Sequence, residues 1–326
     1  MLGVNQLDFL NYTTALKGNY RKGVHKLRAI LANPKHAEEF ATNLGGVSVV
    51  FGVPIGSADK NSDQLLALLQ ASTVIDTASL TWVSQWYPES ASSWDEMASD
   101  QSRCKAIYND PMLWRAVSNS SVSVGKIVAT LAGLSCSAYA DMDAVAASQT
   151  AMTAVAGSPT AMAAIWQSDT AIEAVKGNSR AWEIFTGASS SVMGKTVAIL
   201  AGLNPDDYAD MNAVAASQTA MTAVAASQTA LDAIAASNTA LNALYAKKAR
   251  MKGAAAQKTG SIIVLEISAD NFWKDKQYGY AVLSDGSNPK WDAYRTKFAY
   301  FKQFKKIATT IKNDSDPDDW IDYFLC

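Results

Sequence analysis

The sequence Ser217-Gln-Thr-Ala-Met-Thr-Ala-Val-Ala-Ala226 is followed directly by Ser227-Gln-Thr-Ala-Leu-Asp-Ala-Ile-Ala-Ala236 and by Ser237-Asn-Thr-Ala-Leu-Asn-Ala-Leu-Tyr-Ala246. These decapeptides share a serine at the first position and larger apolar residues at the fifth and eighth positions. The same pattern begins at Ser148, Ser158 and Ser168, and a diverged copy begins at Asn178. A period of ten residues therefore decides how the middle of the chain folds.

One long amphipathic helix does not fit this period. At about 100° per residue, ten residues advance a helix by about 1000°, which is roughly 80° short of three turns. The apolar pair would move around the axis with each unit and form no fixed face for a partner. Short helices avoid the problem, because each serine can serve as an N-cap and Pro159 fits a first turn. Gly157 and Gly177 lie where such helices should end.

The same template predicts older copies nearer the N-terminus. Asn33-Pro34 and Asp110-Pro111 repeat the combination of cap residue and proline found at Ser158-Pro159. Weaker copies are expected to begin at Gly23, Ser90 and Asp100.

A longer duplication includes the decapeptides. Gly125–Leu134 reappears as Gly194–Leu203, and Tyr139–Met142 reappears as Tyr208–Met211. Both offsets are 69 residues (194 − 125 and 208 − 139). We expect each copy to consist of one longer helix, ending at the second glycine of this block, followed by several decapeptide helices.

An isolated decapeptide has only two larger side chains to bury, so neighbouring units must cover one another. Alanine lets helices approach closely, and 15 of the 38 residues from Ala209 to Ala246 are alanine. The predicted fold is mainly α, with an array of stacked short-helix repeats.

The composition changes from about Gly253, where alanine becomes rarer and aromatic residues more frequent. Gly260–Ser268 and Tyr278–Leu283 have the composition of β-strands. From Trp291 to Ile311, apolar residues recur every three or four positions, which predicts a helix. We therefore expect a small C-terminal α+β domain.

Three domains follow from these patterns. Residues 1–89 are predicted to be an N-terminal helical segment with degenerate repeats, residues 90–252 the decapeptide array, and residues 253–326 the α+β domain. Within the first segment, Asn43–Asp63 is rich in Gly, Val and Ser and is expected to form a hairpin or an extended loop.

The composition argues against several classes of site. The 326 residues carry 28 Lys and Arg against 30 Asp and Glu, a net charge of −2, which does not favour nucleic-acid binding over the whole surface. There are two histidines, His25 and His36. Cys104, Cys136 and Cys326 are too few and too scattered for a disulfide framework or a zinc site, which suggests a reducing compartment.

Neither a secretory signal nor a membrane segment is expected. The first twenty residues lack a basic start followed by an apolar run. Met211–Ala246 carries a single charge, Asp232, but a bilayer-spanning helix needs about 20 predominantly large apolar residues, and this stretch is mostly alanine.

Two charged motifs have both a chemical and a structural interpretation. Lys297–Lys306 interleaves basic and aromatic residues, as single-stranded nucleic-acid sites do, but an amphipathic helix with buried aromatic residues is favoured. Asp314–Asp319 resembles a calcium loop, yet it lacks the glycine and glutamate of an EF-hand, so a solvated acidic turn is favoured.

Asp95-Glu96 and Asp206-Asp207 are carboxylate pairs, but acidic residues also favour helix starts. Cys326 could cross-link chains in an oxidising medium, although a passive role is favoured. We expect no catalytic, cofactor-binding or metal-binding residues, no cofactor and no enzymatic activity.

The decapeptides, of which Ser217–Ala226 is an example, resemble repeats in virion structural proteins of tailed bacteriophages, including tail-fibre, other tail and collar components. The resemblance covers residues 137–246 firmly and reaches back to about Gly23 through degenerate copies. It implies a non-enzymatic, multi-copy part of a phage particle, assembled in the bacterial host cytoplasm and located in the virion, with other virion structural proteins as partners.

Three functional hypotheses follow. The preferred one is a structural component of the virion (tail fibre, collar or baseplate-associated attachment), which acts through protein–protein contacts, with no nucleic acid and no membrane among its partners. The second is a host-surface-binding adhesin, whose partner-contact residues would be Trp273, Tyr278, Tyr280 and Trp291. The third is a hydrolase with its site in the C-terminal domain.

Overall fold

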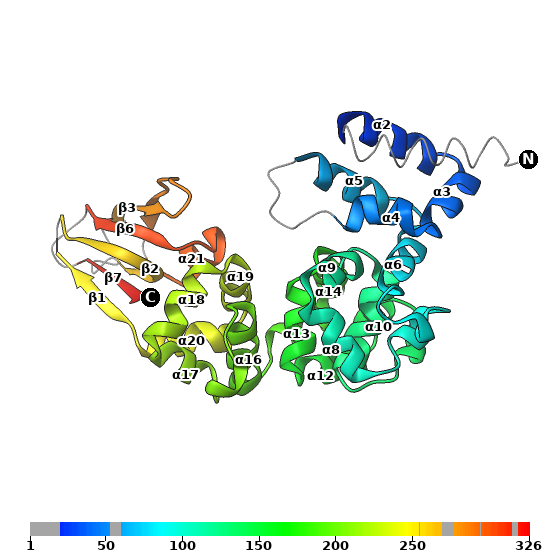
Figure 1. Cartoon of the computed structure of the whole chain (residues 1–326). Helices are drawn as coiled ribbons and strands as arrows, with labels where there is room; N and C mark the ends of the chain where they lie inside the picture. Colours follow the sequence, from blue (N-terminus) through cyan, green and yellow to red (C-terminus); the bar gives the residue numbers. More distant parts are fainter. Residues whose placement is uncertain (1–19, 53–59, 254, 269–276, 294, 315–318) are drawn as a thin grey trace, which may run out of the picture. The chain divides into compact units, whose positions relative to one another are not determined.

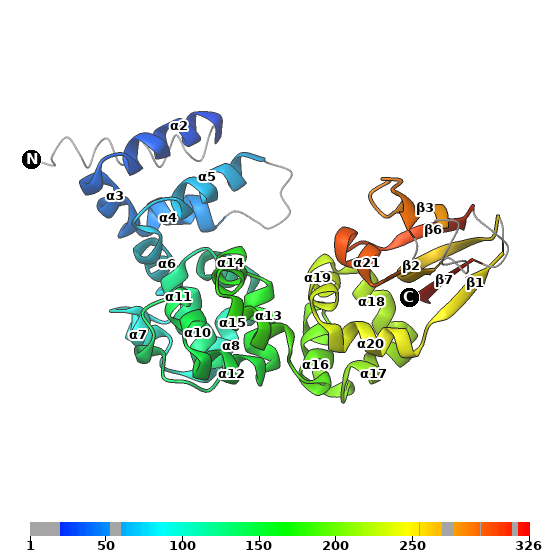
Figure 2. The same cartoon turned by 180° about the vertical axis from the view of Figure 1, so that it is seen from behind.

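The computed structural model describes residues 20–52, 60–253, 255–268, 277–293, 295–314 and 319–326. These residues form 20 α-helices and a small C-terminal sheet (Figures 1 and 2). The fold class predicted from the sequence, mainly α with a small α+β part, is therefore confirmed.

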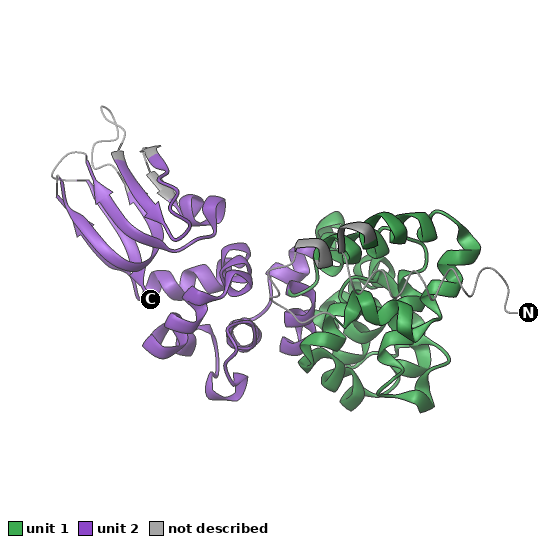
Figure 3. Ribbon diagram, turned by 45° about the horizontal axis from the view of Figure 1, so that its top comes forward, with its two compact units in different colours: residues 1–155, 167–181 green, residues 156–166, 182–326 purple. Residues whose placement is uncertain are grey.

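The chain divides into two compact units, which Figure 3 colours separately. Unit 1 comprises residues 1–155 and 167–181, and unit 2 comprises residues 156–166 and 182–326. These borders lie inside the decapeptide array and do not follow the composition changes near residues 89 and 252. The helix at 159–166 belongs to unit 2, since it packs against the longer helix at 190–200.

The helices of unit 1 are α2 (Tyr20–Leu31), α3 (Pro34–Ala41), α4 (Leu44–Phe51), α5 (Lys60–Gln70), α6 (Ile75–Val83), η1 (Pro88–Ser90), α7 (Trp94–Met97), α8 (Gln101–Asn109), α9 (Pro111–Val117), α10 (Ser121–Leu131), η2 (Cys136–Ala138), α11 (Met142–Ala147), α12 (Gln149–Ala156) and α14 (Asp169–Gly177). The helices of unit 2 are α13 (Pro159–Trp166), α16 (Ser190–Leu200), η3 (Pro205–Asp207), α17 (Met211–Ala216), α18 (Gln218–Ala226), α19 (Gln228–Ala236), α20 (Asn238–Ala246) and α21 (Ala299–Phe304). Helix α15 (Ser179–Thr186) crosses the border between the units.

The decapeptide helices are separated by a single extended residue. Ser217, Ser227 and Ser237 have φ between −98° and −108° and ψ between 107° and 116°. Ser227 ends α18 and begins α19, and its Oγ accepts the N–H of Ala230 at 3.3 Å. One residue in the extended region is enough to redirect the chain, and its side chain satisfies an N–H group of the next helix. The predicted broken helices are confirmed.

The two larger apolar positions of each unit form the core of the array. In the six clear copies these side chains are at most 7% exposed, namely Met152, Val155, Met162, Ile165, Ile172, Val175, Met221, Val224, Leu231, Ile234, Leu241 and Leu244. In unit 2 the helices do not lie in a simple row, because α17 contacts α20 as well as α18, and α16 contacts all four. The longer helix of the duplication is thus a central element for its decapeptide helices.

Two glycines in each copy of the duplication have a structural requirement. Gly133 and Gly202 follow α10 and α16 with φ of +79° and +72°. The next residue in each case donates its N–H back to the helix, Leu203 to the Ala198 carbonyl at 2.9 Å, as in a Schellman cap. Gly194 lies within α16, where a Cβ atom would be 2.2 Å from the carbonyl carbon of Asp210.

The degenerate N-terminal copies are confirmed in part. Asn33, Asp100 and Asp110 cap α3, α8 and α9 as expected. Ser93, not Ser90, caps α7. Gly23 lies inside α2, because a helix covers residues 20–31 without a break.

The prediction of a hairpin or loop at Asn43–Asp63 is wrong for the described residues. Asn43 caps helix α4, whose Val47, Val50 and Phe51 side chains are buried. Burial of this apolar segment outweighs the low helix propensity of its glycines and valines. Residues 53–59 lie outside the described part.

The C-terminal strands form one seven-stranded sheet with the order β1-β7-β2-β6-β3-β4, and β5 pairs with β2. The strands are β1 (Ala249–Lys252), β2 (Gln257–Ser268), β3 (Gln277–Leu283), β4 (Lys290–Ala293), β5 (Arg295–Lys297), β6 (Ala308–Asn313) and β7 (Trp320–Leu325). All pairings are antiparallel. The two predicted strands correspond to β2 and β3.

The helix predicted from Trp291 to Ile311 is wrong, because only α21 is helical there and strands β4, β5 and β6 occupy the rest. Phe298 and Lys305 flank α21 with φ of +62° and +52°. This left-handed conformation limits the helix to six residues. Ile311 packs in the sheet core with Ile262, Val264, Ile321 and other apolar residues.

Among the described residues, no single helix is long and apolar enough to cross a membrane. Taken together, Asp63–Gln70 and Ile75–Val83 reach the required length and composition, but the chain bends by 120° between them.

Candidate functional site

The four aromatic residues predicted as partner contacts are placed only in part. Trp273 lies outside the described residues. Tyr278 and Tyr280 are in β3, and Trp291 is in the adjacent β4, where its backbone is paired with Gly279. Tyr280 is half-buried, and the Nζ of Lys312 lies 5.7 Å from its ring centroid. The structure thus brings three of the four backbones onto two paired strands.

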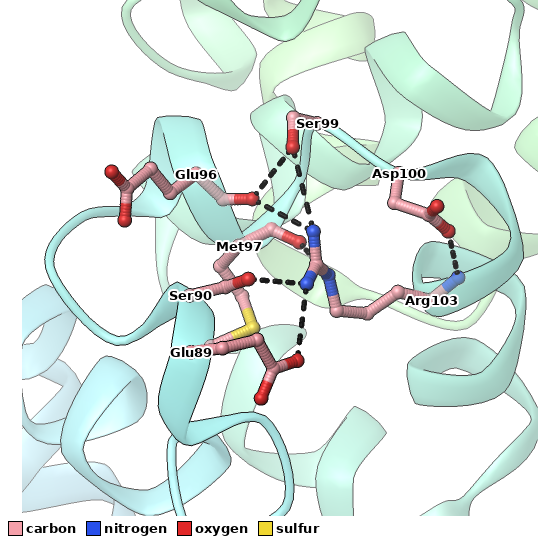
Figure 4. A network of polar contacts seen from close by, with 7 residues as sticks. All are labelled: Glu89, Ser90, Glu96, Met97, Ser99, Asp100 and Arg103. Carbon is pink, nitrogen blue, oxygen red and sulfur yellow. Dashed lines mark hydrogen bonds and ion pairs between the residues drawn. The ribbon is translucent and has the colours of Figure 1, made fainter.

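Two polar clusters deserve to be tested for chemistry, one in each unit. The first surrounds the short helix α7. The guanidinium of Arg103 donates to the carbonyls of Met97 and Glu96 at 2.8 and 3.0 Å, and it contacts Ser90 and Glu89 (Figure 4). The last carbonyls of a helix have no partner within it, and here an arginine from α8 supplies the donors.

Lys126 and Thr130 of α10 fix the other side of α7. Lys126 is 6% exposed, and its Nζ lies 2.6 Å from Asp95 and 3.2 Å from the Cys136 carbonyl. Thr130 donates to the Ala98 carbonyl at 2.6 Å. The carboxylate of the Asp95-Glu96 pair therefore binds a lysine of the core, and the cluster as a whole anchors α7 between α8 and α10.

The second cluster joins α20 to the sheet, and we call Tyr245, Lys248, Arg250, Glu266 and Asp322 the Tyr245 cluster. Glu266 and Asp322 are 1% and 0% exposed, and they are direct partners in the pairing of β2 with β7. The Tyr245 hydroxyl donates to Glu266 at 2.5 Å and lies 3.4 Å from Asp322. One hydroxyl of the array thus contacts two buried carboxylates of adjacent strands.

The carboxylates are compensated by groups from β1 and its approach. Arg250 binds both oxygens of Asp322, with Nε at 2.6 Å and Nη2 at 2.8 Å. The Nζ of Lys248 lies 3.8 Å from Asp322 and 3.6 Å from the ring centroid of Tyr245. Such two-point arginine–carboxylate bonds are among the stronger polar contacts in proteins.

Electrostatics keeps the Tyr245 hydroxyl protonated. Burial and, next, the bond to Glu266 raise the pKa of Tyr245 to about 12. The bond to Asp322 raises the pKa of Arg250 above its already high ordinary value. At neutral pH the cluster therefore contains a neutral tyrosine that donates and a guanidinium that remains charged.

A carboxylate pair beside a tyrosine has the residue types used in general acid–base catalysis. Here both carboxylates are buried and bonded to groups of the chain itself, so neither presents an oxygen to a substrate in this conformation. The arrangement joins the last repeat helix to the sheet. Within the described residues, no group of three or more His, Cys, Asp or Glu side chains could hold a metal ion.

The sequence contained two signals for this cluster that its period did not reveal. Tyr245 stands at the ninth position of its decapeptide, where Ala225 and Ala235 stand in the two preceding copies. Glu266 is a lone acid in the apolar run Ile262–Ile267. A charged residue in an otherwise buried strand usually has a partner, and here the partner is 21 residues away.

The other predicted sites have structural explanations. Asp206 and Asp207 are exposed in η3, and Lys195 lies 3.4 Å from Asp206. Only the Ala299–Phe304 part of Lys297–Lys306 is helical, and it buries Tyr300 and Phe301. Asp314–Asp319 is mostly outside the described residues. Cys326 is only 9% exposed, and burial raises the pKa of its thiol to about 12.

A comparison with protein families finds no matching family model, and a comparison with curated proteins finds no match.

Proposed function

We propose that this chain is a structural component of a tailed-bacteriophage virion, in a tail fibre, a collar or a baseplate-associated attachment. In this role it acts through protein–protein contacts, without catalysis and without a cofactor. The phage setting of the proposal comes from the resemblance of the decapeptides. Its partners are other virion structural proteins, and the chain is present in several copies per particle.

The observation that best supports a scaffold role is the way in which polar groups are used inside the molecule. Serine hydroxyls cap successive helices, and Arg103 binds the end carbonyls of α7. Tyr245 and Arg250 bind the two buried carboxylates of the sheet. Bonds of this kind fix the positions of helices and strands, which is the property that a spacer between other proteins needs.

Cofractionation with particles tests the proposal. Phage particles purified by density gradient should contain the chain at a fixed ratio to the other virion proteins, and the ratio should persist after a second gradient. Absence from the particle band, or a ratio that falls on repurification, would contradict the proposal. A hydrolase acting in the infected cell would be found in the soluble lysate fraction instead.

A further inference from the structure

Charge is unevenly distributed along the chain. Residues 138–246 carry nine Asp and Glu against three Lys and Arg, a net charge of −6. Residues 247–326 carry 14 Lys and Arg against ten Asp and Glu, a net charge of +4. The repeat array is thus acidic and the sheet region basic, although the whole chain is nearly neutral.

The basic charge is concentrated where the array meets the sheet. The six residues of Lys247–Lys252 include four cations and no acid. Their last four residues form β1, an edge strand, which in the described part pairs with β7 alone (Figure 1). Lys297 belongs to the same surface, since its Nζ and that of Lys248 lie 3.9 and 3.6 Å from the Tyr245 ring centroid.

We call Lys247, Lys248, Arg250, Lys252 and Lys297 the basic edge. Lys247, Lys252 and Lys297 are exposed, and the side chains of Arg250 and Lys248 are 47% and 30% exposed. The carboxylates beneath these five cations are Asp322 and Glu266, both buried. Even if each carboxylate neutralises one cation, three positive charges remain over this surface.

We propose that the basic edge of one copy of this chain docks onto the acidic repeat array of a second copy. The opposite net charges of the two regions favour this encounter and select its orientation. The contacting surfaces differ, so the contact is heterologous, and each copy offers both halves of it. The same interaction can therefore repeat from copy to copy.

Exposed lysines on an edge strand also prevent strand-to-strand aggregation, and this role requires no partner. The two roles differ in what salt and charge reversal do. A purely protective edge leaves the chain monomeric at every ionic strength, and reversal of its charges creates no defect in assembly. A docking edge gives self-association that weakens as salt screens the charges.

The test is sedimentation analysis of the purified full chain at about 0.01 M and about 1 M salt, between which the Debye length falls from about 30 Å to about 3 Å. The wild-type chain should self-associate at low salt and dissociate at high salt. Lys247→Glu with Lys252→Glu should weaken self-association by about tenfold or more, because two attractive contacts become repulsive.

The matched control is Lys35→Glu with Lys105→Glu, which reverses two exposed lysines of unit 1 and changes the net charge equally. This control should associate like the wild type. Circular dichroism and the unfolding midpoint verify that each variant is folded. A wild-type chain that is monomeric at low salt, or a control as defective as the edge variant, would overturn the proposal.

A mixing experiment identifies the second surface. The edge variant keeps its acidic array, so a tagged edge variant should still capture untagged wild-type chain at low salt, although it does not associate with itself. Failure of this capture would show that the array is not the partner surface. Self-docking can fail while the chain still cofractionates with particles, so the two proposals are tested separately.

Discussion

At the scale of single residues, the serine between two decapeptide helices can form more than a cap. Ser217 Oγ accepts the N–H of Ala220 at 3.2 Å. Ser227 Oγ accepts the N–H of Ala230 at 3.3 Å and in addition donates to the Leu200 carbonyl of α16 at 2.7 Å. The second bond joins a junction to the central helix of its copy.

This difference predicts unequal costs for the same substitution. Ser217→Ala should lower the free energy of unfolding of unit 2 by about 1 kcal/mol, the usual value of an N-cap. Ser227→Ala should lower it by about 2 kcal/mol, because a tertiary hydrogen bond is lost as well. Denaturant unfolding of both variants measures the difference. Equal costs would contradict a separate role for the bond to Leu200.

Gly194 provides a second prediction at this scale. In Gly194→Ala the added Cβ would lie 2.5 Å from the nitrogen of Met211 and 2.6 Å from the oxygen of Asp210, both backbone atoms. Helix α17 would have to move, at a cost of about 3 kcal/mol. The control is Gly177→Ala, where no atom lies within 4 Å of the added Cβ, and stability should be unchanged or slightly higher. Thermal unfolding of both variants tests this contrast.

At the scale of elements, the local signals were the ones that the sequence revealed. A serine, asparagine or aspartate before an apolar pair predicted the starts of most helices, because a cap bonds to residues two or three positions away. The aromatic spacing after Trp291 failed, because Phe298 and Lys305 adopt a left-handed conformation that non-glycine residues seldom take. The Tyr245 cluster was invisible to local patterns, since Tyr245 and Asp322 are 77 residues apart.

The joint between α20 and the sheet gives the third prediction. Tyr245→Phe keeps the ring but removes the hydroxyl from the buried Glu266, which should cost about 1–3 kcal/mol of unfolding free energy at pH 7. The control is Tyr208→Phe, whose hydroxyl has no hydrogen-bond partner within the described residues, and its stability should not change. Denaturant unfolding at pH 7 compares the two variants.

The pKa of Tyr245 fixes how this cost depends on pH. Its value of about 12 in the folded chain is above the ordinary value of about 10. The stabilisation is therefore complete below about pH 10 and is lost as the pH rises through about 12. The stabilities of wild type and Tyr245→Phe should converge over that interval. A difference that stays constant up to pH 12 would show that the hydroxyl does not stabilise the joint.

At the scale of the whole molecule, packing and composition divide the chain differently. The composition changes near residue 253, but unit 2 includes α13 and α16–α20 together with the sheet. Helix α13 belongs by sequence to the first copy of the duplication, yet it packs on α16 of the second. Contacts between copies therefore set the border of the compact units, and a composition profile does not contain them.

The three cysteines allow a prediction that covers both units. Cys104, Cys136 and Cys326 are free thiols and are all buried. Burial is the largest cause that raises the pKa of Cys104 and of Cys326 to about 12. Against an ordinary thiol of pKa about 9, the fraction of reactive thiolate falls by about a thousandfold. The native chain should therefore resist both thiol reagents and cross-linking through Cys326.

Labelling with a chromogenic disulfide reagent at pH 8 measures this protection. Native chain should react slowly, whereas denatured chain should release three equivalents at once, one for each cysteine. Cys326→Ser should lower the denatured value to two and leave the slow native rate unchanged, because no single thiol is expected to dominate it. Air-oxidised native chain should run as a monomer on a non-reducing gel. Rapid labelling of one thiol in the native chain, located by peptide mapping, would show that its unit opens far more readily than the packing around that cysteine implies.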